Sequence, residues 1–194
     1  MKADALVLFG ATGDLAKKKL FPALYDLEEL NELDVKIIGV ASSKWTQEVF
    51  RENVEAAIRV RKPDADEKVL SKLLNEMQLL VGDYENPETF VELAELIKDF
   101  KLPVIYLAIA PEHFAKITQG LATVGVTKRA RVVVEKPFTN TSAEAKELIE
   151  LSASTGKVCS VYQNRRYVTD FLTMKKIVDG GREGVSGSQH GCIV

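Results

Sequence analysis

The chain has 194 residues, of which 46% are hydrophobic and 28% charged, and its formal net charge is -2. This composition is typical of a globular protein with one domain and a core that needs no covalent staples. The near-neutral charge argues against the basic surface that nucleic acid or an anionic membrane would require. The two cysteines and two histidines show neither the spacing of a metal site nor that of a disulfide framework; they are Cys159, Cys192, His113 and His190.

Targeting and membrane signals are absent from the pattern. The N-terminus lacks the basic segment, apolar core and cleavage site of a signal peptide. No apolar run approaches the ~18 residues that span a bilayer. We therefore expect a cytoplasmic protein that binds neither nucleic acid nor membrane.

A glycine turn near the N-terminus is the first candidate site. The apolar run 5–9 predicts a buried strand, and an amphipathic helix is predicted from Asp14 to Leu30. Between them lie Gly10, Ala11, Thr12, Gly13, Asp14 and Leu15. Glycine lets a backbone approach a phosphate, and a helix N-terminus presents N–H groups with partial positive charge. The turn is therefore a candidate pyrophosphate site, with a tight turn that holds no ligand as the alternative.

The predicted first helix carries three further signals. Its leucines at helical spacing, Leu20, Leu24, Leu27 and Leu30, predict one buried face. Lys17, Lys18 and Lys19 lie in its early turns, where cations oppose the helix dipole unless an anion is nearby. A solvated face and a phosphate-binding role both fit this cluster. Pro22 predicts a kink or a break.

The end of the second predicted strand, residues 35–40, bears on the coenzyme. In a dinucleotide fold this end meets the adenosine ribose, where a carboxylate favours NAD and basic or hydroxyl groups favour NADP. Ser42, Ser43 and Lys44 stand there without a carboxylate. The sequence therefore favours NADP, although a polar turn that caps the next helix is compatible with the same residues.

The remaining pattern alternates helices and strands. Helices are predicted at 47–61, 65–75, 86–100, 141–156 and 170–178, with strands at 77–81, 104–109, 131–135 and 157–162. Residues 82–84 are predicted to form a plain turn. This alternation predicts an α/β fold, a doubly wound and mostly parallel Rossmann-type sheet with helices on both faces.

Two further strand ends carry candidate site residues. Ala108 and Pro111 follow the strand 104–109, and Glu135 closes the strand 131–135, at the edge where open α/β sheets bind ligands. His113 lies in the first turn of the following helix, which favours a neutral packing or hydrogen-bonding role over general-base catalysis. Lys136 could bind an anionic or hydroxylated substrate, or transfer a proton if burial lowers its pKa, whereas a surface lysine is the structural alternative.

Several of these segments resemble the glucose-6-phosphate dehydrogenase family. They are residues 10–24, 37–46, 82–84, 106–108 and 133–138, which follow that family's order. The resemblance implies NADP-linked oxidation of a phosphorylated aldose to its lactone. It implies that Gly10–Leu15 hold the pyrophosphate, that Ser42 and Lys44 lie at the 2′-phosphate, and that Lys19 and Lys136 approach the substrate.

The chain also departs from that family. Ser42 stands where the family usually carries an arginine, and the Asp-His pair and lysine expected after Phe138 are absent. The segments 135–139, 141–156, 161–167 and 180–184 instead resemble the glucose–fructose oxidoreductase/inositol dehydrogenase family. That resemblance implies that Lys136 lies near the nicotinamide and sugar, and that the segment containing Arg165, a candidate substrate ligand, leads toward a further domain.

Three functional hypotheses follow. The first is the coenzyme-binding portion of an NADP-dependent sugar-phosphate dehydrogenase; the second is a sugar oxidoreductase of the other family, using NAD or NADP. The third is a dinucleotide-binding module without turnover. We expect residues 1–184 to form the coenzyme domain, 185–194 to be a Gly/Ser-rich tail, and the substrate domain to be absent. A homo-oligomer is compatible with the sequence.

Overall fold

The computed structural model describes residues 3–135, 146, 150 and 160–162. The chain divides into two compact units, Met1–Val133 and Val134–Val194. The first unit carries the glycine turn and almost all of the described structure. Of the second unit, the described part includes the strand β6 (Ser160–Tyr162) and the end of β5 (Arg131–Glu135).

A parallel sheet forms the centre of the first unit. Its strands are β1 (Ala5–Phe9), β2 (Lys36–Ala41), β3 (Met77–Val81), β4 (Pro103–Leu107) and β5, in the order β3-β2-β1-β4-β5. In the register, Leu8 of β1 lies opposite Gly39 of β2 and Tyr106 of β4. The order reverses between β1 and β4, which is the switch point where doubly wound sheets bind ligands. The predicted fold class is confirmed.

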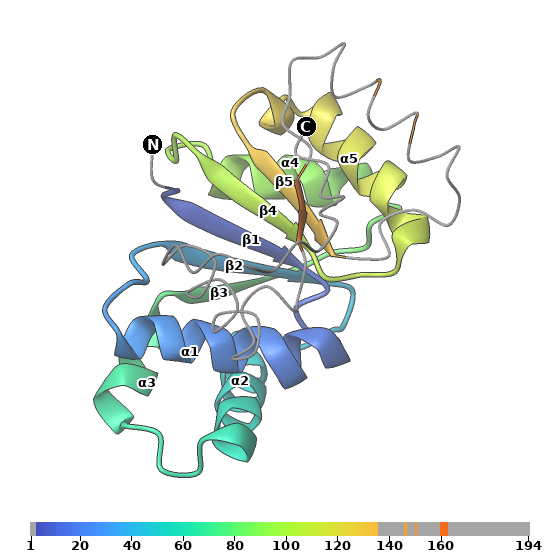
Figure 1. Cartoon of the computed structure of the whole chain (residues 1–194). Coiled ribbons are helices and arrows are strands. Elements are labelled where there is room, and N and C mark those ends of the chain that lie inside the picture. The colour runs from blue at the N-terminus through green and yellow to red at the C-terminus, as the bar shows by residue number, and fades with distance from the viewer. Residues whose placement is uncertain (1–2, 136–145, 147–149, 151–159, 163–194) are drawn as a thin grey trace, which may run out of the picture. The chain divides into compact units, whose positions relative to one another are not determined.

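Helices cover both faces of this sheet (Figure 1). On one face lie α1 (Phe21–Glu29), α2 (Gln47–Arg61) and α3 (Glu67–Asn75); on the other lie α4 (Pro87–Leu96) and α5 (Phe114–Thr123). Two short 3₁₀ helices, η2 (Pro111–His113) and η3 (Val126–Lys128), flank α5. Burial on both faces explains why the strands are nearly continuous apolar runs.

The first helix begins at Asp14 and continues through a π-helical segment, η1 (Ala16–Leu20), in which the Phe21 N–H donates to the Ala16 carbonyl five residues back. Pro22 follows in the first turn of α1 and is buried. Because proline has no N–H to continue the ladder, the predicted break takes the form of this wider turn.

The predicted leucine face of α1 is wrong at its C-terminal end. Leu27 is 38% exposed and Leu30 65% exposed, whereas the buried side chains are Phe21, Pro22, Leu24, Tyr25 and Glu28. Asn31 adopts a left-handed φ of 55°, and its N–H and that of Glu32 donate to the carbonyls of Glu28 and Leu27. This C-terminal cap ends the helix before Leu30 can turn inward.

The other element boundaries follow local capping. Thr46 caps α2 and Asn86 caps α4. α3 begins at Glu67, not at residue 65, because the Asp66 carboxylate accepts from the N–H groups of Lys68 and Val69. α4 ends at Leu96, short of residue 100, and β2 and β4 are each displaced by one or two residues from the predicted ranges.

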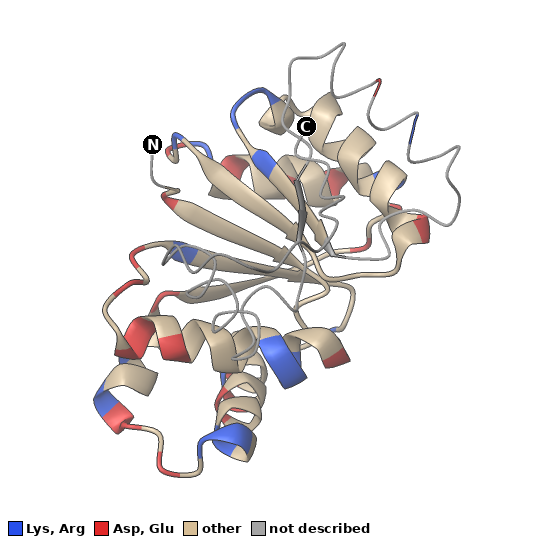
Figure 2. Ribbon diagram, in the orientation of Figure 1, with Lys and Arg blue, Asp and Glu red and all other residues tan. Residues whose placement is uncertain are grey.

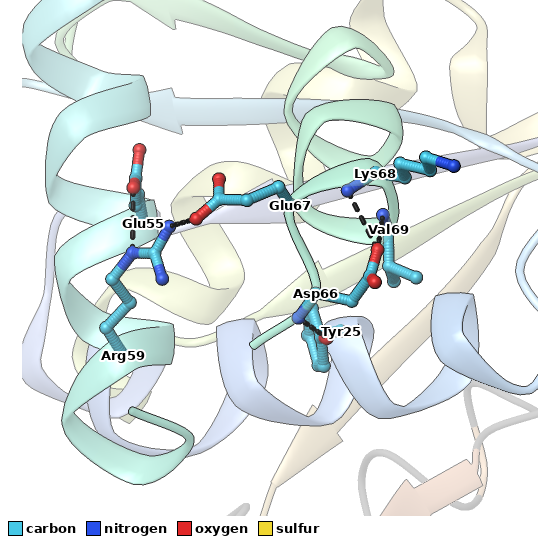
Figure 3. Close-up of polar contacts among 7 residues, drawn as sticks. All are labelled: Tyr25, Glu55, Arg59, Asp66, Glu67, Lys68 and Val69. Carbon is cyan, nitrogen blue, oxygen red and sulfur yellow. Dashed lines mark hydrogen bonds and ion pairs between the residues drawn. The ribbon is translucent and has the colours of Figure 1, made fainter. Parts of the chain in front are cut away.

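A polar cluster joins α1, α2 and α3 (Figure 3). The Tyr25 hydroxyl accepts from the Asp66 N–H at 2.8 Å, and Arg59 donates to Glu55 and Glu67 at 2.8 and 2.6 Å. Nearby, Lys72 of α3 pairs with Glu28 of α1, whose side chain is only 3% exposed. These contacts hold the three helices of this face together.

None of the helices in the described ranges is long and apolar enough to cross a membrane. Several predicted elements lie outside the described residues: most of the helix 141–156, the first part of the strand 157–162, the helix 170–178 and the tail 185–194.

Candidate functional site

The glycine turn is built where β1 meets β2 and β4. Gly10 has a φ of 81°, and a Cβ on it would lie 2.4 Å from the Ala108 carbonyl oxygen. Its N–H donates to the Val40 carbonyl at 3.0 Å, and the Ala108 N–H donates to the Phe9 carbonyl at 3.0 Å. Only glycine fits this position, for both conformational and steric reasons.

The residues after Gly10 divide between the core and the surface. Ala11 is fully buried and packs on Gly39, where an added Cβ would lie 2.8 Å from the Ala11 Cβ. The Gly13 N–H donates to the Gly10 carbonyl at 2.9 Å, and the Lys17 N–H donates to the Gly13 carbonyl at 3.1 Å. The turn thus leads directly into a helix, whose first N–H groups have no partners within the helix. Asp14 and Leu15 occupy that first turn.

The turn and the end of β2 meet through two hydroxyl groups. Thr12 Oγ1 and Ser43 Oγ lie 2.9 Å apart, and both side chains are half-buried. Ser42 and Lys44, on either side of Ser43, are exposed. Thr12 and Ser43, which the sequence assigns to two different phosphate contacts, are therefore neighbours.

Tyr84 stabilises the glycine turn. It lies in the segment 82–84, which was predicted to be a plain turn. Its hydroxyl accepts from the Gly10 N–H at 3.0 Å and donates to the Val40 carbonyl at 3.2 Å. Its ring packs against Phe9, with centroids 5.5 Å apart. Burial raises the pKa of the Tyr84 phenol, opposed by the hydrogen bond from Gly10, so the hydroxyl stays protonated at neutral pH. The segment is a turn, as predicted, but the prediction missed that Tyr84 bonds to the glycine turn.

The lysines of η1 form a blue stretch of the ribbon early in the first helix (Figure 2), but their side chains differ in their surroundings. Lys18 Nζ donates to Asp14 Oδ2 at 2.6 Å, and this bond lowers the Asp14 pKa. Lys17 Nζ instead lies over the Trp45 ring, 4.9 Å from its centroid. Lys19 is exposed. The basic cluster therefore flanks the glycine turn but does not act as a single unit.

The end of β4 forms the other side of the switch point. Ala108 is 8% exposed and contacts the Gly10 backbone, whereas Pro111 begins η2 and is half-buried. His113 ends η2 and caps α5; its Nε2 lies 3.8 Å from Glu112 Oε1, and its ring packs edge-on to Tyr84 at 6.2 Å. These contacts are those of a packing residue.

The remaining predicted residues are not joined to this site by the structure. Lys136 and Arg165 lie outside the described residues, and Glu135 is described only as the last residue of β5. Within the described residues, no three His, Cys, Asp or Glu side chains are placed to hold a metal ion.

The roles of Tyr84, Trp45 and Gly39 in this site were not predicted from the sequence. A positional signal was present: Tyr84 follows β3 and Trp45 follows β2, both at the carboxyl edge where the glycine turn lies. The contacts themselves join residues 74 and 28 positions apart in the chain, and no local pattern encodes such pairs.

A parallel sheet with a switch point, and a glycine turn that enters a helix there, define a Rossmann domain of the dinucleotide-binding class. Residues 7–169 match the family described as glucose-6-phosphate dehydrogenase, NAD binding domain. The chain belongs to the glucose-6-phosphate dehydrogenase family. The match runs beyond Phe138, where the predicted resemblance ends.

Relatives and solved structures agree with this assignment. Glucose-6-phosphate 1-dehydrogenase 1 from Mycobacterium bovis is 40% identical over 185 residues, covering 91% of this chain and 37% of the relative. The Bacillus subtilis glucose-6-phosphate 1-dehydrogenase is 32% identical and covers 69% of this chain and 29% of its own. This chain thus spans little more than a third of the curated relatives it matches.

Among solved structures, glucose-6-phosphate 1-dehydrogenase from Mycobacterium avium has a TM-score of 0.73 at 39% identity, covering 78% of this chain and 34% of its own. A glucose-6-phosphate dehydrogenase in complex with glucose-6-phosphate has a TM-score of 0.69 at 32% identity, covering 79% and 35%. An NAD binding oxidoreductase from Klebsiella pneumoniae, at 16% identity and a TM-score of 0.52, covers 92% and 39% and shares the fold alone.

Proposed function

We propose that this chain is the coenzyme-binding portion of a dehydrogenase that uses NADP to oxidise glucose 6-phosphate to its lactone. A bound nicotinamide would accept a hydride from the sugar, and the chain would bind and orient it. The proposal extends to this chain what the relatives' names state of them.

The observation that carries the proposal is the cradle at Gly10. Gly10 has a left-handed backbone, packs against Ala108 and hydrogen-bonds to β2. Because Gly10 has no side chain, a pyrophosphate could approach the start of the helix closely at this turn. Gly10, Ala11, Thr12, Gly13, Asp14 and Leu15 would hold that group through their backbone. Ala11 would contribute backbone alone, because its side chain is buried.

The choice of NADP rests on the end of β2. Ser42, Ser43 and Lys44 supply hydroxyl groups and a cation and no carboxylate, which suits a 2′-phosphate better than a free 2′-hydroxyl. Ala108, Pro111 and Glu135 would line the coenzyme further along the same edge. Lys19, Lys136 and Arg165 would contact the sugar phosphate, with Lys136 as the group nearest the reacting carbon.

The test combines binding with turnover. NADPH and NADH are titrated by their fluorescence, and reduction of NADP is then followed at saturating glucose 6-phosphate. We expect NADPH to bind more tightly than NADH. Binding without NADP reduction would contradict dehydrogenase activity of this chain by itself and leave a coenzyme-binding module. Absence of binding to either coenzyme would contradict both.

Two controls sharpen the assay. Reduction of NADP with glucose or inositol, and none with glucose 6-phosphate, would instead support a sugar oxidoreductase of the second resembled family. Light scattering during size-exclusion chromatography would test self-association, which we include in the proposal because Val91 and Leu96 of α4 are exposed apolar side chains.

A further inference from the structure

Lys17 is a half-buried cation that forms no ion pair among the described residues, although its charge, after the hydrogen bond from Lys18, also lowers the pKa of Asp14. Its ammonium lies 4.9 Å from the centroid of the Trp45 ring, whereas the neighbouring Lys18 pairs with Asp14. An ammonium held over an aromatic face keeps donors free for a further ligand. The Lys17 ammonium is therefore positioned by an aromatic ring and not by an ion pair.

The contacts around Lys17 form a closed ring at the junction of the glycine turn and β2. The Thr12 and Ser43 hydroxyls meet at 2.9 Å, and the Trp45 N–H donates to the Ser43 carbonyl at 2.8 Å. The Lys17 ammonium lies over the Trp45 ring, and the Lys17 backbone N–H donates to the carbonyl of Gly13, the residue after Thr12, at 3.1 Å. Two hydroxyl groups, one cation and one aromatic face are thus fixed relative to one another.

We infer that Lys17, held by Trp45, is the specificity-determining cation for the 2′-phosphate of NADP, with Thr12 and Ser43 as its hydroxyl partners. The inference rests on the proposed function and deepens it. A phosphate monoester carries close to two negative charges at neutral pH and accepts several hydrogen bonds, which this donor set can supply. The end of β2 is where a dinucleotide fold places the adenosine ribose.

Lys44 is the competing cation, since it lies next to Ser43 in the sequence. Its side chain is exposed, so binding would have to order a long flexible chain. Lys17 is already ordered by the Trp45 ring, and this lowers the entropic cost of binding. The geometry therefore favours Lys17 over the lysine that the sequence suggested.

The test uses adenosine fragments that differ in the 2′-phosphate and contain no nicotinamide. Calorimetry measures the affinity of 2′,5′-ADP and of 5′-AMP for the intact chain, and for Lys17→Met, Lys17→Arg, Lys18→Met and Lys44→Met. Trp45 is the one tryptophan of the sequence, so its fluorescence reports directly on this subsite. Circular dichroism and thermal melts confirm that each variant is folded.

Loss of the Lys17 cation should weaken 2′,5′-ADP by on the order of tenfold to a hundredfold and leave 5′-AMP within about twofold. Lys17→Arg should retain most of the preference for 2′,5′-ADP over 5′-AMP, and Lys18→Met should retain all of it. Lys44→Met should reduce this preference much less than Lys17→Met does. 2′,5′-ADP should change the Trp45 fluorescence of the wild type more than 5′-AMP does.

A preference that survives in Lys17→Met, or that is lost in Lys44→Met instead, would overturn the inference and leave the proposed NADP function standing. Equal loss in Lys17→Arg and Lys17→Met would also overturn it, because the charge would then not be what matters. A wild type that binds both fragments equally would overturn the inference together with the choice of NADP.

Discussion

Gly10 and Gly125 share a left-handed backbone, with φ of 81° and 75°, but differ in their surroundings. A Cβ on Gly10 would meet Ala108 at 2.4 Å, whereas nothing lies within 4 Å of one on Gly125. Gly125→Ala should therefore cost about 1 kcal/mol in the free energy of unfolding, from the backbone conformation alone. Gly10→Ala should cost about 2 kcal/mol more, because rigid backbone must move.

Urea unfolding of the two variants and of the wild type measures these losses. Gly10→Ala should also weaken NADPH binding, since the turn would shift, and Gly125→Ala should not. Equal losses in the free energy of unfolding in both variants would contradict a steric clash between the added Cβ at Gly10 and Ala108.

The Tyr84 hydroxyl is the second feature at this scale. Tyr84→Phe removes its bonds to Gly10 and Val40 and should cost about 1 kcal/mol in unfolding free energy. Coenzyme affinity should fall several-fold, because the turn loses its brace. Tyr25→Phe is the matched control: its hydroxyl is also bonded, to Asp66 and Glu29, but within the α1–α3 cluster. Comparable stability loss with unchanged NADPH affinity is expected there.

At the scale of elements, an alanine at Gly120 in α5 would have two opposing effects on the free energy of unfolding. It lies inside α5, where helix propensity favours alanine by about 1 kcal/mol. A Cβ there would lie 2.5 Å from the Phe90 ring, which is buried at the junction of α4 and α5. Overpacking of a rigid ring costs about 1–3 kcal/mol, so we expect Gly120→Ala to be destabilising in urea unfolding. In a protein that also carries Phe90→Leu, the loss in unfolding free energy caused by Gly120→Ala should be smaller, because the ring is gone. If Gly120→Ala were more stable than the wild type, helix propensity would outweigh the contact with Phe90.

The contact between α1 and α3 depends on the buried Glu28 carboxylate. Lys72→Met would leave that carboxylate without its cation and should destabilise the protein several times more than Lys36→Met. The Lys36–Glu76 pair serves as the control because both partners are substantially exposed, at 55% and 38%. Thermal melts at neutral pH compare the two variants.

The same pair predicts a dependence on pH. The hydrogen bond to Glu28 raises the pKa of Lys72 in the folded state above its ordinary value. The stabilisation is therefore fully present below about pH 10.4 and is lost as pH rises through the raised folded value. Between neutral and alkaline pH, the difference in unfolding free energy between wild type and Lys72→Met should narrow only as the pH rises through that raised pKa. A narrowing that begins near pH 7 would contradict this sign.

Element boundaries show what the sequence predicts well and what it does not. Apolar patterns predicted α2, β1, β3 and β5 correctly, because their signals lie within a few residues. The buried face of α1 was mispredicted, since the π-turn before Phe21 and the cap at Asn31 change which side chains face inward. Contacts such as Tyr84 with Gly10 depend on the assembled sheet and have no local signature.

For the molecule as a whole, the ends of β1, β2, β3 and β4 bring the Gly10 turn, Ser43, Tyr84 and Ala108 to one edge of the sheet. Parallel strands share their carboxyl edge, so the sequence predicted this meeting of strand ends from the order of elements. Which residues contact one another at this edge could be seen only in the structure. Coenzyme binding should therefore stabilise the first unit as a whole and not merely one loop.

Gly13→Asp tests that coupling between the turn and the whole fold. At a hundredfold excess over Kd, a coenzyme should add about 2.7 kcal/mol to the stability of the wild type and raise its Tm by roughly 5–10 °C. Gly13 has an ordinary backbone, and a Cβ there lies 3.1 Å from the Gly10 carbonyl, so the variant should still fold. Its carboxylate would stand at the pyrophosphate and abolish the shift in Tm. Gly125→Asp adds the same charge in open space beyond α5 and should keep the shift. A full shift in Gly13→Asp would show that NADPH binds somewhere other than this turn.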